Sequence, residues 1–571
     1  MRFLEGGNAM KINLNANGFE QHKALFVKTV QNRIRAKFVE GGITVTLGVE
    51  PSLGPAESYR IKPVTGGWQI TGSDELGLYF GIGKFLHTAV WKNDEFHPAP
   101  PEGIKTPACS FRAMYFPFHH YQWYHMAPME ELEDYVEQML LWGYNAIVCI
   151  TPNINVASFE EEAFVTVTER VRTLFRCVKR YGMKTGTIIC PNQGNKAAPE
   201  ELNNDPNFNQ LMRGNKGRNI CPNKPGAIDY LRTIWRGSAL EPLADIGLDY
   251  IITWPYDEGG CGCAKCRPWG ANGYLDTCIA LRDEALKLYP DVKFIVSTWA
   301  YDDPEDEGEY AGLYSRLAGD IVWADYLMID AHRDFPQYPL EHPVIKPIVN
   351  FPEISMWGLA PWGGFGANPL PKRFQRIWDS SKSILSGGMP YSEGIYEDIL
   401  KVQCSGYYWE PDKHYRDILA EYINYEYSAD VVKEVLEIME GIEENHVLVA
   451  GLKEPDLERA LHVAQLAEQV NDRLTEQVRC RWKWKLLYIR AILDKKRYQY
   501  FHDNNMKGEA DAFLLRKHSA DFLIEDLEAQ EMLRELVEWY HMNEENQNWS
   551  TFPGVGGSKY PKGDETPLPA F

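Results

Sequence analysis

Two adjacent carboxylates, Asp257 and Glu258, follow a short apolar run and precede two glycines in the segment ITWPYDEGG. Neighbouring residues of a strand point to opposite faces, so both side chains reach one pocket only where the backbone turns. Gly259 and Gly260 permit such a turn. Two carboxylates placed close together disfavour double ionisation, so one of them can act as an acid near neutral pH. Asp257 and Glu258 are therefore the catalytic candidates; a polar loop with two solvated acids is the alternative.

Polar and aromatic residues also follow most of the other strand-like runs. Protein cores rarely bury carboxylates. Carboxylates at the ends of these runs therefore favour a functional site over a purely structural fold. Trp299 and Trp357 are candidate walls for a ligand, and Tyr301 or Tyr391 could donate a hydrogen bond to it. The remaining candidates for substrate binding are His119, His120, Asn153, Trp254, Glu353 and Glu393. Each of the aromatic residues could instead belong to the core, and each histidine could be structural.

A cysteine cluster follows the carboxylate pair directly. GGCGCAKCRPWG supplies Cys261, Cys263 and Cys266, and a fourth ligand could be Cys221 or Cys190. Four thiolates suit Zn²⁺, which prefers tetrahedral N and S ligands. A closed site of four cysteines leaves no open position, so we expect a structural zinc that holds the loop of Glu258, and no cofactor for catalysis. A loop of free thiols is the alternative.

The element pattern between residues 106 and 404 predicts a (β/α)₈ TIM barrel, an α/β fold. Apolar strand-like runs alternate with helical segments such as MEELEDYVEQMLLWG. Active sites of such barrels lie at the carboxyl ends of the strands. The eight predicted strands are FRAMYF, NAIVCI, KTGTIIC, LDYIITW, KFIVSTW, DIVWADYL, PVIKPIVNF and GGMPYSEG.

Two further domains are predicted to flank the barrel. Residues 1–105 indicate a small α/β domain, with strands at GITVTLGV and GWQITGS and a helix at LGLYFGIGKFLHTAVW. Residues 405–571 indicate a helical C-terminal domain followed by a tail, because DVVKEVLEIMEGIEEN, DLERALHVAQLAEQVNDRL and AQEMLRELVEWYHMN carry apolar residues at helical spacing.

Composition excludes several classes of function. The 571 residues carry a formal net charge of −21, which disfavours nucleic-acid binding. No apolar stretch reaches the 18 residues that indicate a membrane span. No secretory signal is evident, so we expect a cytoplasmic protein with reduced thiols. The sequence does not determine the oligomeric state.

Three parts of the sequence resemble a known family. The segment ESYRIKPVTGGWQITGSDELGLYFGIGKFLH (57–87) is similar to the small domain that precedes the barrel in family 20 β-N-acetylhexosaminidases and their relatives. Arg112 matches the arginine that grips sugar hydroxyls there, and Asp257–Glu258 match the catalytic Asp-Glu pair. The family pattern HxGGDE is replaced by WPYDEGG, so a related β-N-acetylgalactosaminidase fits better. The helical C-terminal domain resembles those of α-glucuronidases.

The resemblance implies a retaining, substrate-assisted hydrolysis, in which the 2-acetamido oxygen of the substrate attacks the anomeric carbon. Asp257 would hold the acetamide N–H and stabilise the developing positive charge. Glu258 would protonate the leaving oxygen and then deprotonate water. The expected activity is an exo-acting β-N-acetylhexosaminidase on N-acetylgalactosamine or N-acetylglucosamine in small oligosaccharides or glycosides.

Two other functions stay open. An inverting, uronidase-like glycosidase would use Glu258 as the acid, with Glu353 or Glu393 activating water across a wider gap. A non-catalytic carbohydrate-binding barrel would keep the fold without turnover.

Overall fold

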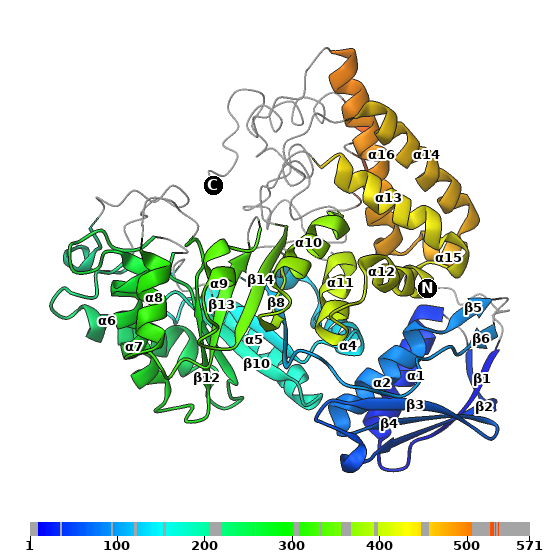
Figure 1. Cartoon of the computed structure of the whole chain (residues 1–571), viewed down its shortest axis with the longest axis horizontal. Helices are drawn as coiled ribbons and strands as arrows, with labels where there is room; N and C mark the ends of the chain where they lie inside the picture. The colour runs from blue at the N-terminus through cyan, green and yellow to red at the C-terminus, as the bar shows by residue number, and fades with distance from the viewer. Residues whose placement is uncertain are drawn as a thin grey trace.

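The computed structural model describes residues 9–34, 37–92, 95–118, 123–151, 156–205, 219–256, 259–301, 308–331, 334–355, 367–392, 398–446, 456–504, 526–529, 531–532 and 535. A barrel occupies the middle of the chain, with a small α/β domain beside it and a helical domain above it (Figure 1). None of the described helices combines the length and the apolar character that crossing a bilayer requires.

Eight parallel strands close into a barrel, which confirms the predicted (β/α)₈ fold. Each strand pairs with the next in chain order, and the eighth pairs with the first to complete the ring. A short ninth strand, β16 (Tyr391–Ser392), continues the eighth and pairs with the seventh. The barrel strands are β8 (Phe111–Phe116), β9 (Ala146–Ile150), β10 (Lys184–Ile189), β11 (Tyr250–Thr253), β12 (Lys293–Ser297), β13 (Tyr326–Ala331), β14 (Ile348–Ser355) and β15 (Leu385–Gly388).

The sixth predicted strand, DIVWADYL (320–327), is displaced from the observed one. Ile321 and Ala324 lie in turns, and β13 begins only at Tyr326. Both residues are fully or almost fully buried. Their apolar character therefore reflects burial of a turn beneath the helices, which hydrophobicity alone does not distinguish from a strand.

The closure of the barrel depends on two glycines of β15. A Cβ atom on Gly387 would lie 1.7 Å from the carbonyl oxygen of Phe111, and Gly387 also has a φ of +137°. A Cβ atom on Gly388 would lie 1.8 Å from Oδ1 of Asn350. Glycine alone lets the first, seventh and eighth strands approach this closely.

Eight helices alternate with the strands and cover the outside of the barrel. Their sequences place apolar residues on the strands and many of the charges in solvent, whereas Asp398, Glu309 and Arg373 are buried. α6 is continued by a π-helical segment, Arg236–Leu240, and a short helix, α3 (Trp123–Met126), precedes α4. The covering helices are α4 (Met129–Leu141), α5 (Glu162–Arg180), α6 (Ala227–Trp235), α7 (Gly273–Ala285), α8 (Glu309–Leu317), α9 (Gln337–Glu341), α10 (Pro371–Ser381) and α11 (Asp398–Trp409).

The small domain is a five-stranded sheet with two helices. The strand order is β1-β2-β4-β3-β7, formed by β1 (Ala9–Asn15), β2 (Lys37–Val49), β3 (Tyr59–Val64), β4 (Gly67–Gly72) and β7 (Ile104–Lys105). The helices are α1 (Glu20–Ile34) and α2 (Glu75–His87), and β5 (Val90–Lys92) with β6 (Glu95–His97) forms a separate hairpin. α2 packs closely on α4 of the barrel, since a Cβ atom on Gly83 would lie 2.0 Å from the carbonyl oxygen of Leu141.

The helical domain follows the barrel without a break. The boundary expected between residues 404 and 405 falls inside α11, which serves as the eighth barrel helix. The later helices are α12 (Tyr415–Glu426), α13 (Val432–Glu444), α14 (Leu457–Arg473), α15 (Glu476–Arg479) and α16 (Trp482–Asp503). A buried ion pair anchors α16, because Nζ of Lys483 lies 2.6 Å from Oδ2 of Asp398 and 2.9 Å from Oε1 of Glu426. Most of AQEMLRELVEWYHMN lies outside the described residues.

Candidate functional site

Aromatic rings fill the inside of the barrel in two levels. At the amino ends of the strands, the Phe111 ring lies 5.1 Å from that of Tyr250 and 5.7 Å from that of Tyr326. These three residues come from strands that are not neighbours, so the rings meet across the interior. Side chains alternate along a strand, so Tyr115 of β8 also points inward, at the carboxyl end.

Five aromatic side chains form the upper level, which we call the mouth cluster: Tyr115, Trp254, Trp299, Phe351 and Tyr391. The Trp254 and Trp299 rings stack at 5.3 Å, and the Tyr115 and Tyr391 rings stack at 5.2 Å. Phe351 lies 5.6 Å from Trp254 and from Trp299. All five are buried. The cluster thus joins predicted site residues from the fourth, fifth and eighth strands with two that were not predicted.

The indole N–H of Trp254 is buried and has no hydrogen-bond partner within the described part of the chain. The backbone N–H of the same residue donates to the carbonyl of Ile189, 3.1 Å away. The backbone of Trp254 is therefore held by β10, and its ring packs against Trp299.

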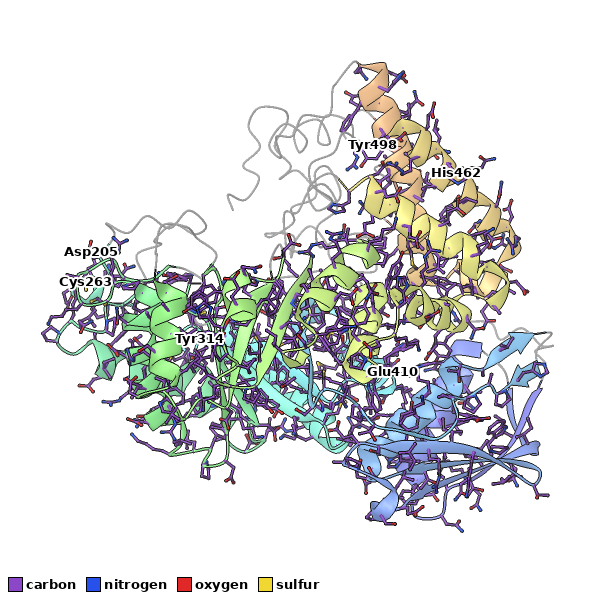
Figure 2. All side chains as sticks on the ribbon, viewed as in Figure 1. Asp205, Cys263, Tyr314, Glu410, His462 and Tyr498 are labelled. Atoms are coloured by element: carbon purple, nitrogen blue, oxygen red, sulfur yellow. The ribbon has the colours of Figure 1, made fainter. Side chains whose placement is uncertain are left out.

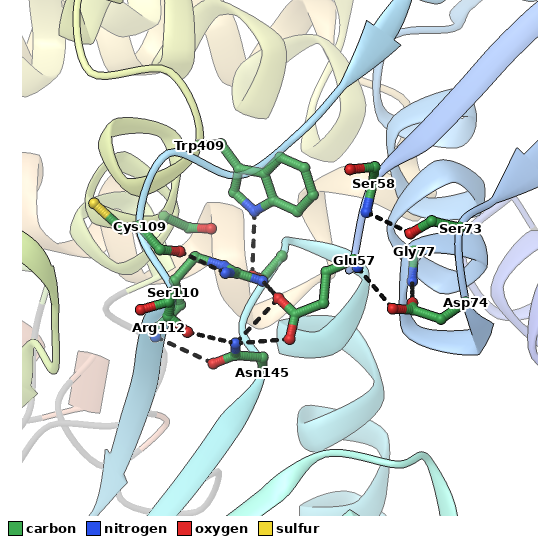
Figure 3. A network of polar contacts seen from close by, with 12 residues as sticks. Glu57, Ser58, Ser73, Asp74, Gly77, Cys109, Ser110, Arg112, Asn145 and Trp409 are labelled. Carbon is green, nitrogen blue, oxygen red and sulfur yellow. Dashed lines mark hydrogen bonds and ion pairs between the residues drawn. The ribbon is translucent and has the colours of Figure 1, made fainter. Parts of the chain in front are cut away.

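Arg112 does not join this group, and we correct its assignment to substrate binding. It lies near the amino end of β8, and it alternates with the inward-facing Phe111 and Tyr115, so its side chain leaves the barrel interior. The side chain is fully buried and bound within the protein (Figure 3). Nη2 lies 2.5 Å from Oε2 of Glu57 in the small domain, Nη1 donates to the Cys109 carbonyl at 2.7 Å, and Nε donates to the Gly143 carbonyl at 2.8 Å.

Tyr301 is also placed away from the mouth cluster. Its hydroxyl donates to the carbonyl oxygen of Gly270, and its ring packs edge-on against Tyr256 and Tyr310. Burial raises the pKa of Tyr301 well above its usual value, so the hydroxyl stays protonated. The residue supports the loop after β11, and we correct its expected hydrogen bond to substrate accordingly.

Two buried carboxylates lie at the carboxyl ends of neighbouring strands. Glu353 belongs to β14, beside Tyr391 in the strand pairing, and its main-chain carbonyl accepts from Nη1 of Arg373 at 2.8 Å. Asp330 belongs to β13, and its Oδ2 accepts from the backbone N–H of Ala300 at 3.2 Å. Burial lowers the pKa of Arg373, and the nearby Glu353 carboxylate counteracts that shift.

Several predicted site residues lie outside the described residues. They are the catalytic candidates Asp257 and Glu258 and the substrate-binding candidates His119, His120, Asn153, Trp357 and Glu393. Their assignments remain predictions.

The chain on either side of positions 257 and 258 is described and is held firmly. Before the pair, the Tyr256 hydroxyl hydrogen-bonds to the buried carboxylate of Glu309, and the Pro255 carbonyl accepts from Nε1 of Trp269 at 2.6 Å. The backbone N–H of Gly259 donates to the Tyr256 carbonyl at 3.3 Å, which joins the two flanks.

After the pair, two asparagines bind the glycine carbonyls. Nδ2 of Asn192 donates to the carbonyl of Gly259 at 3.3 Å, and Nδ2 of Asn204 donates to that of Gly260. Gly259 has a φ of +106°, and a Cβ atom on Gly260 would lie 2.4 Å from the Trp269 ring. Both glycines are thus required by the geometry that follows β11.

The four predicted metal ligands come together. The sulfur atoms of Cys221, Cys261, Cys263 and Cys266 all lie within 4.8 Å of one another. Cys221 resolves the two sequence alternatives for the fourth ligand, because Cys190 is not a member of the group. Figure 2 labels Cys263 and Asp205 at one end of the barrel, and the backbone N–H of Gly262 donates to the Asp205 carbonyl at 3.3 Å.

Sequence reasoning missed Tyr115, Phe351, Asp330 and Glu309. Tyr115 and Phe351 lie within predicted strands and were not selected as site residues. Each occupies an inward-facing position near the carboxyl end of its strand, which is a position that faces the mouth of a barrel. Asp330 was hidden by the displacement of the sixth strand. Glu309 begins α8, far along the chain from Tyr256, so local patterns give no signal for that contact.

No family model matches the sequence, and no curated protein sequence matches it either. Solved structures do match. A family GH115 4-O-methyl-α-glucuronidase with specificity for decorated arabinogalactans superimposes with a TM-score of 0.59 at 11% identity, covering 98% of this chain and 81% of that one.

Two further solved structures are similar. A family GH89 protein from Clostridium perfringens, in complex with its substrate GlcNAc-α-1,4-galactose, has a TM-score of 0.58 at 11% identity, covering 88% of this chain and 65% of that one. A GH20 exo-β-N-acetylglucosaminidase from Vibrio harveyi has a TM-score of 0.50 at 12% identity, covering 77% and 75%. At these identities the likeness establishes the shared barrel fold.

Proposed function

We propose that the chain is a glycoside hydrolase, an exo-acting β-N-acetylhexosaminidase that uses Asp257 and Glu258. The observation that carries the proposal is the rigid frame at the end of β11. Tyr256 and Gly259 are hydrogen-bonded to each other just after β11. Active sites of such barrels lie at the carboxyl ends of the strands, which supports a catalytic role for the two acids that stand between them in the sequence.

In the proposed reaction the 2-acetamido oxygen of the substrate attacks the anomeric carbon and the glycosidic bond breaks. Glu258 donates its proton to the leaving oxygen, and Asp257 accepts a hydrogen bond from the acetamide N–H and balances the positive charge of the cyclised intermediate. Glu258 then removes a proton from the water that opens that ring, so the enzyme returns to its initial state.

The mouth cluster supports this assignment. Stacked indoles such as Trp254 and Trp299 offer an apolar wall of the kind that suits the faces of sugar rings, and their burial keeps water away from a charged intermediate. The similar barrels include one described as an exo-β-N-acetylglucosaminidase and one bound to a GlcNAc-containing disaccharide, so the fold accommodates N-acetylhexosamines elsewhere.

The first test is hydrolysis of nitrophenyl β-GalNAc, β-GlcNAc and glucuronide substrates. We expect turnover of at least one of the acetamido sugars and inhibition by a thiazoline that mimics the cyclised acetamide. Glu258→Gln should lower kcat by roughly 10²- to 10⁴-fold for natural glycosides, with a smaller loss for nitrophenyl substrates, whose leaving groups need less protonation. Asp257→Asn should also lower kcat strongly, and a rate like that of the wild type would remove Asp257 from the mechanism.

A second candidate function is an inverting glycosidase for uronic acids. The buried Glu353 beside Tyr391 favours it, since a second carboxylate on the barrel face could activate water opposite Glu258. Glucuronide turnover that is abolished by Glu353→Gln, without thiazoline inhibition, would select this function. Binding of sugars without turnover of any substrate would instead indicate a carbohydrate-binding barrel.

A further inference from the structure

The four clustered sulfurs come from two separate loops at the carboxyl face of the barrel. Cys221 lies between β10 and α6, whereas Cys261, Cys263 and Cys266 lie between β11 and α7. Cys221, Cys261 and Cys266 are buried, and Cys263 is partly exposed. The cluster therefore links the loop that precedes α6 to the loop that begins with Gly259 and Gly260.

Two sulfur–sulfur distances fit the ligands of a tetrahedrally coordinated cation. Cys221 Sγ lies 3.8 Å from Cys263 Sγ and 3.9 Å from Cys266 Sγ. A Zn–S bond of about 2.3 Å in tetrahedral geometry requires sulfur atoms about 3.8 Å apart along each edge. A disulfide would instead require about 2.05 Å. These two distances are thus those of ligands around one ion and not those of an oxidised pair, and all four sulfurs lie within 4.8 Å of one another.

Hydrogen-bond donors contact two of the four sulfurs, as donors contact thiolates in metal sites. The backbone N–H of Asp205 donates to Cys261 Sγ at 3.4 Å, and Nδ2 of Asn223 donates to Cys266 Sγ at 3.1 Å. Such donors orient the ligands and partly neutralise their negative charge. Two donors directed at sulfur are a second observation, independent of the distances, that the sulfurs act as thiolate ligands.

We propose that Cys221, Cys261, Cys263 and Cys266 bind one structural Zn²⁺ that fixes the loop after Gly260. Binding displaces the remaining thiol protons and forms four Zn–S bonds without any oxidation or reduction. Four cysteines complete the tetrahedron, so the ion has no open position for substrate. Metal binding stands independently of the proposed function. Its effect on catalysis, through the position of the backbone next to Glu258, rests on that function.

The direct test is elemental analysis of the full-length protein purified without added metal. We expect about one zinc per chain, lost in Cys221→Ser and in Cys263→Ser. Cys190→Ser is the matched control, because this cysteine was the other possible fourth ligand and should leave the zinc content unchanged. Absence of zinc together with no uptake of added Zn²⁺, iron in place of zinc, or full retention in the Cys221→Ser protein would each overturn the proposal.

A milder variant covers the case in which cysteine replacements do not fold. Asn223→Ala removes one donor to Cys266 and should release zinc to a chelator roughly 10- to 100-fold more readily. Asn195→Ala, whose side chain donates to the Ala157 carbonyl away from the sulfurs, should release zinc like the wild type. Equal release from both variants would contradict the role of Asn223 and the thiolate character of Cys266.

The effect on catalysis has its own measurement. Removal of zinc from Asn223→Ala should lower kcat while KM changes little, and readdition of Zn²⁺ should restore kcat. Unchanged kcat in the zinc-free protein would overturn the positioning role and leave the metal site intact. A chain that binds zinc but hydrolyses no glycoside would refute the proposed function and not the metal site.

Discussion

The indole N–H of Trp254 is a polar atom that the fold leaves without a partner among the described residues. An unpaired buried donor costs about 1–3 kcal/mol of folding free energy. A sugar hydroxyl or acetamide oxygen at the barrel mouth would recover that cost on binding. This unpaired N–H supports the proposal that Trp254 binds the ligand.

Replacement of Trp254 by Phe should separate binding from stability. The variant keeps an aromatic ring but removes the N–H, so we expect KM to rise roughly tenfold, the equivalent of about 1.4 kcal/mol. The free energy of unfolding should stay within about 1 kcal/mol of the wild type, because the lost donor had no partner in the protein.

Trp378→Phe is the matched control for that variant. The Trp378 Nε1 donates to the Pro411 carbonyl at 2.8 Å, so its loss should lower stability by about 1 kcal/mol and leave KM unchanged. Denaturant unfolding and steady-state kinetics measure both. A large loss of stability in Trp254→Phe with KM unchanged would make Trp254 a core residue.

Single residues also show where sequence reasoning succeeded and failed. Trp254, Trp299 and Tyr391 were chosen because they follow apolar runs, and the structure brings them into one cluster. Arg112 was chosen by resemblance alone, and the alternation of side chains along β8 would have excluded it. Tyr115 occupies an inward-facing position of β8, whereas Arg112 occupies an outward-facing one.

Among whole elements, α13 is followed by a buried histidine whose pKa burial lowers. His446 follows the helix, and Arg490, Asp494 and Arg497 of α16 face it. Burial first, and then the charge of Arg490, lower the pKa of His446 to about 3, while Asp494 counteracts the shift. The contact between these two helices is therefore sensitive to acid.

Between pH 6.5 and about 3 the unfolded chain protonates His446 whereas the folded chain does not. Stability from this group is complete above pH 6.5 and falls as the pH is lowered, by up to about 1.4 kcal/mol per pH unit. His446→Gln should remove that slope, so urea midpoints of the variant and wild type should converge towards acid pH. Parallel curves between pH 7 and pH 4 would contradict the shift.

Element prediction was accurate where apolar runs coincide with strands and failed where they do not. Five of the barrel strands, β8 to β12, largely overlap the predicted runs, because buried parallel strands are continuously apolar. The seventh and eighth overlap them in part. The sixth was displaced, since Ile321 and Ala324 are buried in turns. That displacement placed Asp330 inside an unassigned segment and removed a buried carboxylate from the candidate site.

For the molecule as a whole, the Arg112–Glu57 pair joins the small domain to the barrel (Figure 3). Glu57 has a φ of +67°, unusual for a residue with a side chain, and its backbone N–H donates to Oδ2 of Asp74 at 2.7 Å. The Arg112 guanidinium also packs against the rings of Phe80 and Trp409, 5.3 Å and 5.1 Å from their centroids. One side chain thus contacts both domains.

Arg112→Met should destabilise the protein by roughly 3–5 kcal/mol, because removing one partner of a buried ion pair leaves the other uncompensated. We expect the folded fraction to keep the KM of the wild type, since Arg112 is remote from the barrel mouth. The double variant Arg112→Met with Glu57→Gln should recover part of the stability. A raised KM with normal stability would restore Arg112 to the substrate site.

The barrel closes where Gly387 and Gly388 of β15 pair with β8, and this closure has a consequence for synthesis of the chain. The first barrel strand finds its second neighbour only after Gly388 has been made, nearly half the chain later. At roughly 5–20 residues per second, one edge of β8 waits on the order of half a minute on the ribosome. An apolar strand edge left open for so long invites intermolecular pairing, so the nascent barrel is a natural client for chaperones.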